Sequence, residues 1–436
     1  MNETRMVIYG CRLVDGTGRP PAEDVALVIE KGRIQTVGPT ASVLAASRKQ
    51  GGVEEIDATG QTVIPGLIDS HAHLNFFRPR TSLEIDGVWP PQFMGMVAMS
   101  NAQKVLAAGF TSVVGGGAQF TLDVWVKRAV RAGLFRGPRV MAASRGLTTT
   151  GGDGDWFPSW LHMGMETMMA IADGPREVGK LARQLLKEGP DLLKIFPSGE
   201  NSRVEEFHPQ MYDCPADRDC MTAEEIEAAA AEAHRWGKMV VAHARGDQAV
   251  RNCIQSRVEI ILHATLITDE TIELMVKHPP LAVVPALMPT KLFVEAGRAG
   301  QINPAFFKET GYEHEYETAC VNMRKLRRAG IRVLPGGEYG LFQMPFHGEN
   351  AKDLQLFVED LGYTPHEAIC AATREAAHLM RMEKELGTLE KGKLADLVVV
   401  DGDPIKDIRV LQDKAKLTAV VKDGLVQARF GSVLGV

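Results

Sequence analysis

The chain has 436 residues, of which 45% are hydrophobic and 24% are charged, a composition typical of globular proteins with a large core. Its formal net charge of −6 weighs against nucleic acid and anionic membranes as partners. No apolar run reaches the roughly 18 residues of a membrane-spanning helix. Because the first residues, MNETRMVIYG, lack the basic and apolar regions of a secretion signal, we expect a cytoplasmic protein.

Both ends of the chain predict short strands. Alternating β-type runs joined by Gly-Lys and Asp-Gly turns favour a small antiparallel sheet or sandwich. These runs are residues 6–12, 24–30, 32–37, 393–400 and 417–430. We therefore predict a discontinuous β-sandwich domain made of residues 1–62 and 385–436, with a second domain over residues 63–384.

The middle of the chain alternates near-continuous apolar runs with amphipathic segments. Such runs predict strands buried on both faces of a parallel sheet, and the amphipathic segments predict covering helices. The predicted strands are residues 63–69, 110–117, 138–144, 191–197, 238–244, 258–264, 281–287 and 331–337. The clearest helices are residues 100–109, 175–189, 222–237 and 317–330. Eight strands that alternate with helices predict an α/β fold with a (β/α)8 TIM-type barrel.

Polar side chains stand near the carboxyl ends of five predicted strands, where barrels gather their reactive groups. The first strand leads into LIDSHAHL, in which His71 and His73 share a face because alternate strand residues point the same way. Four other strands each add one side chain, namely Lys194, His243, His263 and Glu338. A single buried histidine is usually structural, but this set suits zinc or another first-row divalent metal.

Lys194 is the unusual member of this set, because an ammonium buried within LLKIF is costly. One interpretation is a lysine that snorkels to solvent or forms a salt bridge. The other is a lysine converted by CO2 into a carbamate, which offers two oxygen ligands. Burial favours the neutral amine that this reaction needs, so we favour the carbamate.

The segment VIPGLIDSHAHL, followed by Lys194, His243, His263 and a terminal acid, resembles the amidohydrolase superfamily. The tail LGTLEKGKLADLVVVDGDP resembles it too, and VVAHARGDQAV and EIILHATLITDE are most similar to its imidazolonepropionase-like, Xaa-Pro dipeptidase-type cluster. So is PFHGENAKDLQLFVEDLGYTPHEAICAATREAA.

The resemblance implies a binuclear centre with two Zn²⁺, or Mn²⁺, Fe²⁺ or Co²⁺ in their place. In it His71 and His73 would hold one ion and His243 and His263 the other. Carboxylated Lys194 would bridge the two ions, while the acid of the eighth strand would touch the first. Relatives are often homo-oligomers, and we expect the same here.

Two positions depart from the superfamily pattern. Glu338 stands where an aspartate is usual, and its extra methylene moves the carboxylate by about an ångström, beyond the tolerance of metal–oxygen bonds. Either the backbone retreats, which Gly336 and Gly337 would permit, or Glu338 acts only as a base. Asp153, in TTTGGDGDW, stands where relatives often have a substrate-facing histidine.

These features favour a metal-dependent hydrolase of an amide, anilide, urea or carbamate, with Glu338 as general base and then acid. Alternatives are a dipeptidase, N-acyl amino acid hydrolase or cyclic-amide hydrolase, and a deaminase. A deaminase is disfavoured because HARGDQAV offers Asp247 where those enzymes place a catalytic glutamate. Arg245 could clamp a substrate carboxylate or be a structural partner of Glu338 or Asp247.

Large apolar residues in the segments after three strands favour a small hydrophobic substrate. They are Trp89, Phe93, Met94, Met96, Trp156, Phe157, Trp160, Met163, Phe342, Met344 and Phe346. The predicted substrate-binding residues are Arg245, Asp153, Tyr212, His347 and Trp156. None of the six cysteines forms a CxxC pair; Cys214 and Cys220 could pair in an oxidising compartment, but we expect free thiols.

Overall fold

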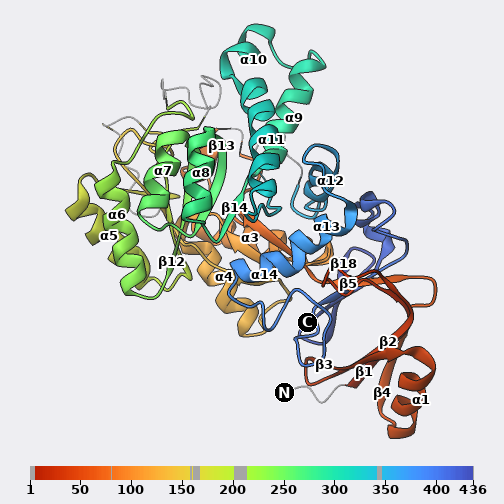
Figure 1. The fold of residues 1–436 in the computed structure, drawn as a ribbon. Helices are drawn as coiled ribbons and strands as arrows, with labels where there is room; N and C mark the ends of the chain where they lie inside the picture. The colour runs from red at the N-terminus through yellow and green to blue at the C-terminus, as the bar shows by residue number, and fades with distance from the viewer. Residues whose placement is uncertain are drawn as a thin grey trace.

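The computed structural model of the chain describes residues 5–79, 81–157, 160, 167–200, 214–340 and 346–435 (Figure 1). The strands of the end sheet are β1 (Arg5–Leu13), β2 (Ala22–Glu30), β3 (Arg33–Pro39), β4 (Val53–Asp57), β5 (Thr62–Pro65), β15 (Leu397–Val400), β16 (Leu417–Lys422), β17 (Leu425–Arg429) and β18 (Ser432–Val433). The central strands are β6 (Leu67–Ala72), β7 (Phe110–Gly115), β8 (Arg139–Met141), β9 (Gly146–Thr148), β10 (Met169–Ile171), β11 (Leu192–Ile195), β12 (Met239–Gly246), β13 (Ile260–Leu266) and β14 (Ala282–Val284).

The α-helices are α1 (Thr40–Gln50), α2 (Ser82–Asp86), α3 (Pro91–Ala107), α4 (Leu122–Arg131), α5 (Pro175–Lys187), α6 (Ala223–Arg235), α7 (Asp247–Gln255), α8 (Asp269–Lys277), α9 (Leu287–Arg298), α10 (Pro304–Thr310), α11 (Tyr312–Arg328), α12 (Lys352–Glu359), α13 (Pro365–Cys370) and α14 (Ala376–Leu379). Short 3-10 turns are η1 (Gln119–Thr121), η3 (Ile408–Gln412) and η4 (Lys414–Lys416), and η2 (Ala371–Glu375) is a π-helical turn.

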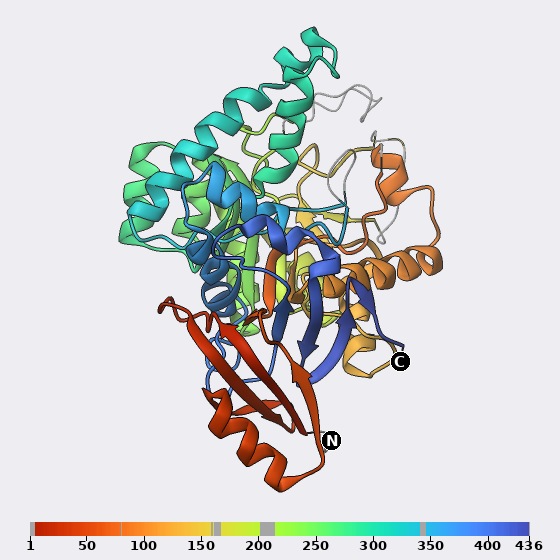
Figure 2. The same cartoon turned by 90° about the vertical axis from the view of Figure 1, so that its right-hand side faces the viewer.

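The two ends of the chain form one sheet, as the short alternating runs at both ends predict. Among the described residues it has nine strands in the order β18-β17-β16-β15-β5-β1-β2-β3, with β4 paired to β1. Figure 2 shows the amino-terminal strands, in red at the bottom of the view, beside the carboxy-terminal ones in blue. The expected antiparallel pairing holds for most neighbours, but β1 pairs with β4 and β5 in parallel. The crossover helix α1 makes this possible for β4, because parallel neighbours require a long connection.

The central strands pair in parallel, as continuous apolar runs predict. They form a three-stranded sheet, β6-β7-β8, and a six-stranded sheet, β10-β9-β11-β12-β13-β14. The two sheets approach where the N–H of Leu192 donates to the carbonyl of Ala142 (3.1 Å). Strands β9 and β10 were not predicted, because three-residue strands carry little periodic signal.

The predicted strand over residues 331–337 forms only an isolated parallel bridge between Val283 and Val333. Pro335 has no N–H to donate and two glycines follow it, so a regular ladder cannot continue. Its carbonyl nevertheless accepts a hydrogen bond from the N–H of Ser70 in β6 (3.1 Å). The segment thus lies between β14 and β6 and carries its last residues towards the carboxyl end of β6, where the N–H of Glu338 donates to the carbonyl of His71.

Helices cover the central strands because their sequences provide clear start signals and an apolar face. Thr222 caps α6 by accepting from the N–H of Glu225, and the Glu225 carboxylate accepts from the N–H of Thr222. The predicted helix over residues 222–237 is therefore found within two residues of its expected ends. Its buried face includes Ile226 and Ala229. Helices α5 to α8 line one side of the molecule in Figure 1.

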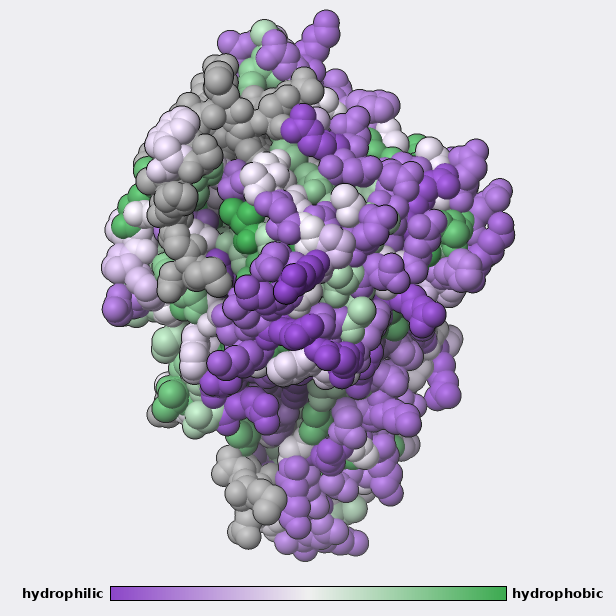
Figure 3. Space-filling view, turned by 90° about the vertical axis from the view of Figure 1, so that its left-hand side faces the viewer, coloured by the Kyte–Doolittle hydropathy of each residue, from purple (hydrophilic) through white to green (hydrophobic). Residues whose placement is uncertain are grey.

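The face shown in Figure 3 is mainly hydrophilic, with hydrophobic residues scattered in small groups. In the described part of the chain, no helix combines the length and apolarity needed to cross a membrane.

Candidate metal centre

His71, within β6, and His73, just after it, face each other at the carboxyl end of the strand. Their Nε2 atoms lie 3.2 Å apart. Nδ1 of His73 lies 2.9 Å from the carbonyl of Gly117, so this nitrogen carries the proton and Nε2 presents a lone pair. The ring of His73 is held by stacking on Phe76. This pair is therefore arranged as two neighbouring nitrogen ligands.

His243 of β12 and His263 of β13 form a second pair. Nδ1 of His243 lies 3.0 Å from Nε2 of His263. The other ring nitrogen of His243 lies 3.3 Å from the carbonyl of Gly199, which assigns its proton to Nε2 and leaves Nδ1 as an acceptor. His263 has φ +73°, which is rare for a residue with a side chain and is found at functional sites.

The histidine cluster, as we call His71, His73, His243 and His263, is buried, and its members are 0–3% exposed. The pKa values of three members, His71, His243 and His263, are lowered well below 6.5. Burial is the largest cause, and the positive charges of neighbouring side chains add to it. Neutral imidazoles with converging ring nitrogens are good ligands for divalent metals. The donor set therefore fits the cation that the sequence predicts.

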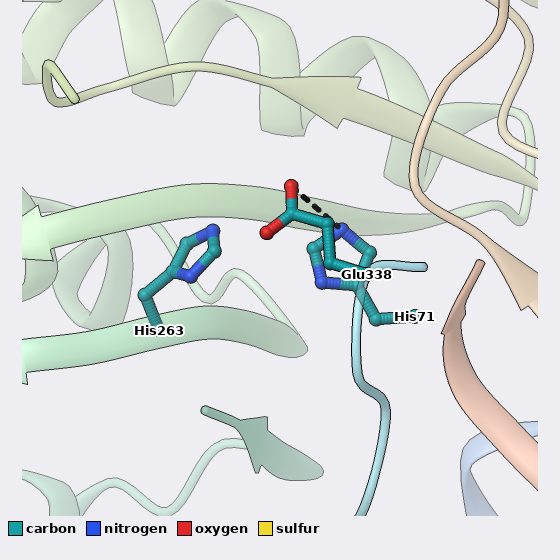
Figure 4. Close-up of side chains that lie close together, drawn as sticks. All are labelled: His71, His263 and Glu338. Carbon is teal, nitrogen blue, oxygen red and sulfur yellow. Dashed lines mark ion pairs between the residues drawn. The ribbon is translucent and has the colours of Figure 1, made fainter. Parts of the chain in front are cut away.

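Glu338 reaches the first pair in spite of its additional methylene. Its Oε1 lies 3.8 Å from Nε2 of His71 and 3.6 Å from Nε2 of His73, and Figure 4 shows its carboxylate between His71 and His263. Ligand atoms of His71, His263 and Glu338 all lie within 4.8 Å of one another. The backbone adapts at Glu338 itself, which has φ +54° and donates its N–H to the carbonyl of His71.

Lys194 of β11 is 1% exposed, and its Nζ lies 4.4 Å from the centroid of the Phe196 ring. Burial lowers the pKa of Lys194 to about 7, although the nearby Glu338 carboxylate opposes this shift. A substantial fraction of this amine is therefore neutral near pH 7. The positive charge of Lys194 also depresses the pKa of His71, His243 and His263, so it lies within electrostatic reach of both pairs.

Four charged residues form what we call the acidic cluster: Asp153, Glu200, Glu315 and the arginine between them, Arg245. Arg245 is 4% exposed and makes two 2.7 Å ion pairs, one with Glu200 and one with Glu315. Asp153 and Glu200 each place a carboxylate oxygen 3.6 Å from Nε2 of His243. Asp153, Glu200 and His243 also qualify as a second group of potential metal ligands.

The family of the chain follows from its likeness to known proteins. A model described as the amidohydrolase family matches residues 62–426. The chain belongs to the amidohydrolase family. The expectation of a hydrolase that acts on carbon–nitrogen bonds is thereby confirmed.

Individual relatives agree with this assignment. Ochratoxinase of Aspergillus niger is 26% identical over 446 residues, covering 96% of this chain and 85% of that protein. Imidazolonepropionase of Haloarcula marismortui is 25% identical over 449 residues and covers 96% of this chain and 95% of that protein. A crystal structure of a Xaa-Pro dipeptidase with bound methionine in its active site has 26% identity and a TM-score of 0.82, covering 97% and 99% of the two chains. The predicted resemblance to the imidazolonepropionase and Xaa-Pro dipeptidase types is confirmed.

A buried polar network supports the strained segment of this amidohydrolase around Glu338. Asp69 accepts hydrogen bonds from the N–H of His71 (3.0 Å) and from the amide of Asn350 (2.6 Å). Tyr339 donates its hydroxyl to the carbonyl of Asn350 and accepts from the N–H of Asp353. Asp353 in turn accepts from the N–H of Gly336 (2.7 Å). This network therefore ties the backbone beside Glu338 to that of His71.

Two glycines are required by the closeness of the backbone to the histidines. A Cβ on Gly116 would lie 2.6 Å from Nε2 of both His71 and His73, in the space between the two ligands. A Cβ on Gly336 would lie 2.5 Å from the backbone nitrogen of His71. Gly336 was predicted as a site of backbone adjustment, whereas Gly116 was not recognised, although the GGG run at 115–117 is a visible signal.

The predicted substrate-binding residues have different surroundings. Asp153 faces His243, whereas Arg245 is engaged by two glutamates. Trp156 belongs to a buried apolar cluster with Phe76, Ile85, Met168, Met169 and Phe196. His347 is buried beside His73 and packs on Gly340, and burial lowers the pKa of His347 to about 3. Tyr212 lies outside the described residues, as do Met163, Phe342 and Met344.

Sequence reasoning did not identify Glu200, Glu315 or the Asp69 network. Glu200 follows the fourth predicted strand, so attention to every carboxylate near a strand end would have found it. Glu315 lies in α11, 70 positions from Arg245, and no local pattern connects the two.

Proposed function

We propose that this amidohydrolase cleaves the C–N bond of a small, uncharged, hydrophobic substrate, namely an amide, anilide, urea or carbamate, by metal-dependent hydrolysis. The observation that carries the proposal is the convergence of ring nitrogens of four buried histidines in two pairs, at 3.2 and 3.0 Å. A hydrophobic core gains nothing from four buried imidazoles whose ring nitrogens converge, whereas a metal site requires them.

In the proposed centre His71 and His73 would hold one divalent ion, His243 and His263 would hold a second, and Lys194, as its carbamate, would supply further oxygen ligands. We propose Zn²⁺, with Mn²⁺, Fe²⁺ or Co²⁺ as substitutes. Such ions supply Lewis-acid chemistry, which makes water a nucleophile near neutral pH and polarises the carbonyl. The low pKa of Lys194 supports the carbamate, because only a neutral amine reacts with CO2.

Glu338 is the proposed general base. Its carboxylate lies beside His71 and His73, with its side chain 12% exposed, so it can accept the proton of the attacking water. The protonated carboxyl then donates the same proton to the leaving nitrogen, since an amine leaves poorly as an anion. The proximity of Glu338 to both histidines also supports a role as a ligand of the first ion.

The charges around the site favour an uncharged substrate. Arg245, the one residue predicted to clamp a substrate carboxylate, is already neutralised by Glu200 and Glu315. Burial raises the pKa of Asp153 well above its usual range and the pKa of Glu200 to about 7, so these two carboxyl groups offer a substrate carboxylate no positive charge. Phe76 and Phe196 stack on His73 and His243 and connect them to the apolar cluster of Trp156, which supports a hydrophobic substrate.

The alternative is a Xaa-Pro dipeptidase, N-acyl amino acid hydrolase or cyclic-amide hydrolase. Its support is the fold similarity to a Xaa-Pro dipeptidase with methionine in its active site. A deaminase has less support, because Asp247 is occupied by the side chain of Arg251 and the N–H of Thr268.

We also infer that the central strands close into an eight-stranded barrel, with the segment 331–337 as the eighth strand. Hydrogen bonds from Leu192 to Ala142, from Leu334 to Val283 and from Ser70 to Pro335 support this closure. The proposed domains are residues 63–384 for the barrel and residues 1–62 with 385–436 for the end sheet.

The substrate proposal is tested with two compounds that differ only in charge, N-benzoyl-phenylalanine and its decarboxylated analogue N-phenethylbenzamide. The protein is loaded with Zn²⁺ or Mn²⁺, and products are identified by mass spectrometry with kcat/KM measured for each. We expect faster cleavage of the neutral compound. Faster cleavage of the acid would favour the dipeptidase alternative.

The carbamate is tested by 13C NMR of protein equilibrated with 13C-bicarbonate and metal. We expect a carbamate resonance that Lys194→Met removes together with part of the bound metal, while Lys187→Met, at an exposed position of α5, keeps both. A structural lysine would instead show no resonance and an unchanged metal content in Lys194→Met.

A further inference from the structure

Cys214 and Cys220 face each other beside the acidic cluster. Their sulfur atoms lie 3.3 Å apart. A disulfide requires about 2.05 Å between its sulfurs, so a side-chain movement of about an ångström would bring the two within bonding distance. Both cysteines were noted in the sequence, where they flank PADRD, but the hydrolytic site does not use either of them.

Backbone hydrogen bonds hold the two cysteines in this position. The N–H of Cys220 donates to the carbonyl of Pro197 (2.7 Å), and the carbonyl of Cys214 accepts from the N–H of Glu200 (2.9 Å). Between them, the N–H of Arg218 donates to the carbonyl of Pro215 (2.9 Å). The separation of the two thiols is therefore fixed by a hydrogen-bonded turn.

The same thiol pair joins the two segments that supply the carboxylates near His243. Cys214 binds the backbone of Glu200, as described. Cys220 packs against Gly152, and its thiol is hydrogen-bonded by the backbone N–H of Asp153. A covalent bond between the two sulfurs would therefore fasten the Asp153 segment to the Glu200 segment.

The remaining cysteines are in different surroundings, which makes this pair selective. Cys220 is partly exposed, so a small oxidant can reach its sulfur, while Cys214 is buried behind it. Cys11, Cys253, Cys320 and Cys370 are all buried. The thiols of Cys11 and Cys370 donate to backbone carbonyls rather than facing a second sulfur.

We propose that Cys214 and Cys220 form a reversible disulfide that fastens the Asp153 and Glu200 side of the site. In the reaction the two thiols lose two protons and two electrons, and a small-molecule disulfide such as oxidised glutathione takes them up to become two thiols. The bond closes a short loop of residues 214–220, which includes Arg218. It forms independently of the hydrolytic reaction, because it requires only the two thiols and the oxidant.

The disulfide is tested on the full chain, equilibrated in mixtures of reduced and oxidised glutathione, alkylated and digested without reductant. Trypsin cleaves after Arg218, between the two cysteines, so the disulfide joins peptides 204–218 and 219–235. We expect this cross-linked pair, two hydrogens lighter than its parts, to appear with oxidised glutathione and disappear with dithiothreitol. Cys220→Ser should abolish it, and Cys320→Ser should leave it intact.

Two outcomes would contradict the proposed disulfide. One is glutathione attached to Cys220, and the other is alkylation of both thiols under oxidising conditions. Its effect on the site is measured as KM before and after oxidation, with an expected change of at least twofold that is absent in Cys220→Ser. A cross-linked protein with unchanged KM would overturn the coupling to the site. A cross-link in a protein that hydrolyses nothing would count against the proposed function alone, and active protein without a cross-link would count against the disulfide alone.

Discussion

The histidine cluster and the acidic cluster meet at His243, yet their charges are balanced in opposite ways. In the histidine cluster, the ring nitrogens of four buried imidazoles converge in two pairs at 3.2 and 3.0 Å. In the acidic cluster, the positive charge of Arg245 is shared by two glutamates at 2.7 Å. The proposed function therefore completes the first cluster with metal ions, whereas the ion pairs of Arg245 lie within the chain.

The difference between the clusters separates two roles within one site. A ligand-binding group leaves hydrogen-bond donors or acceptors without partners in the chain, whereas a structural group finds its partners within the chain. By this criterion we propose that the histidines and Glu338 perform the chemistry and that Arg245 and Glu315 maintain the shape around them. Substitutions on the two sides should therefore have different effects, on turnover in one case and on stability in the other.

The largest effect is expected at Glu338, on the reactive side of the comparison. Glu338→Ala removes the proposed base and should lower kcat by about 1,000-fold while the unfolding midpoint in urea changes little. Glu359→Ala, on an exposed part of α12, is the matched control. Near-normal turnover of Glu338→Ala would mean that another group moves the proton. Glu338→Asp, which restores the usual aspartate, should retain activity and change metal occupancy.

Arg245 should respond in stability rather than in chemistry. Arg245→Met leaves Glu200 and Glu315 buried without their guanidinium, which should cost about 3–5 kcal/mol of unfolding free energy. Arg251→Met is the control: it breaks one partly exposed ion pair with Asp247 and should cost less than about 1 kcal/mol. Urea unfolding measures both. If Arg245→Met is stable and loses only substrates that carry a carboxylate, Arg245 is a substrate clamp.

His347 should make stability depend on pH, because its pKa is about 3 in the fold and near 6.5 in the unfolded chain. Below pH 6.5 the unfolded chain binds a proton at His347 that the folded chain excludes, so the free energy of unfolding falls as the pH drops. The full stability is present above pH 6.5, and about 2 kcal/mol of it is lost at pH 5. His347→Gln should therefore lose less stability than the wild type between pH 7 and pH 5 in urea titrations. Equal losses would show that His347 is already protonated or accessible.

The smallest effect is expected in the network behind Glu338. Tyr339→Phe removes the hydroxyl that joins Asn350 and Asp353, which should cost about 1 kcal/mol of stability and lower kcat severalfold with KM nearly unchanged. Tyr363→Phe removes a hydrogen bond to the carbonyl of Val333, which precedes Gly336 in the same segment, and is the control. If kcat falls equally in both variants, the network has no special role in positioning Glu338.

Much of this candidate site is predictable because its residues stand near strand ends. His71 and His73 share a face through the alternation of a strand, and their separation in the chain is two residues. The recurring apolar runs predict that Lys194, His243 and His263 belong to successive strands of one parallel sheet. The end sheet is predictable only in part, because the runs at both ends give most of its strands but β4 and β18 were not predicted. Residues 63–65, predicted as part of the first central strand, belong to β5 and pair with β15 in the end sheet.

The sequence by itself determined the family and the class of reaction, and it predicted the candidate metal ligands because these depend on residue type and on spacing that secondary structure imposes locally. Tertiary structure alone decided that Glu338 adopts φ +54° and so brings a longer carboxylate to the histidines. It also decided that Arg245 is engaged by Glu200 and Glu315. The physical reason is range: strand alternation acts over two residues, whereas the ion pair between Arg245 and Glu315 spans 70 positions and forms only when β12 and α11 pack together.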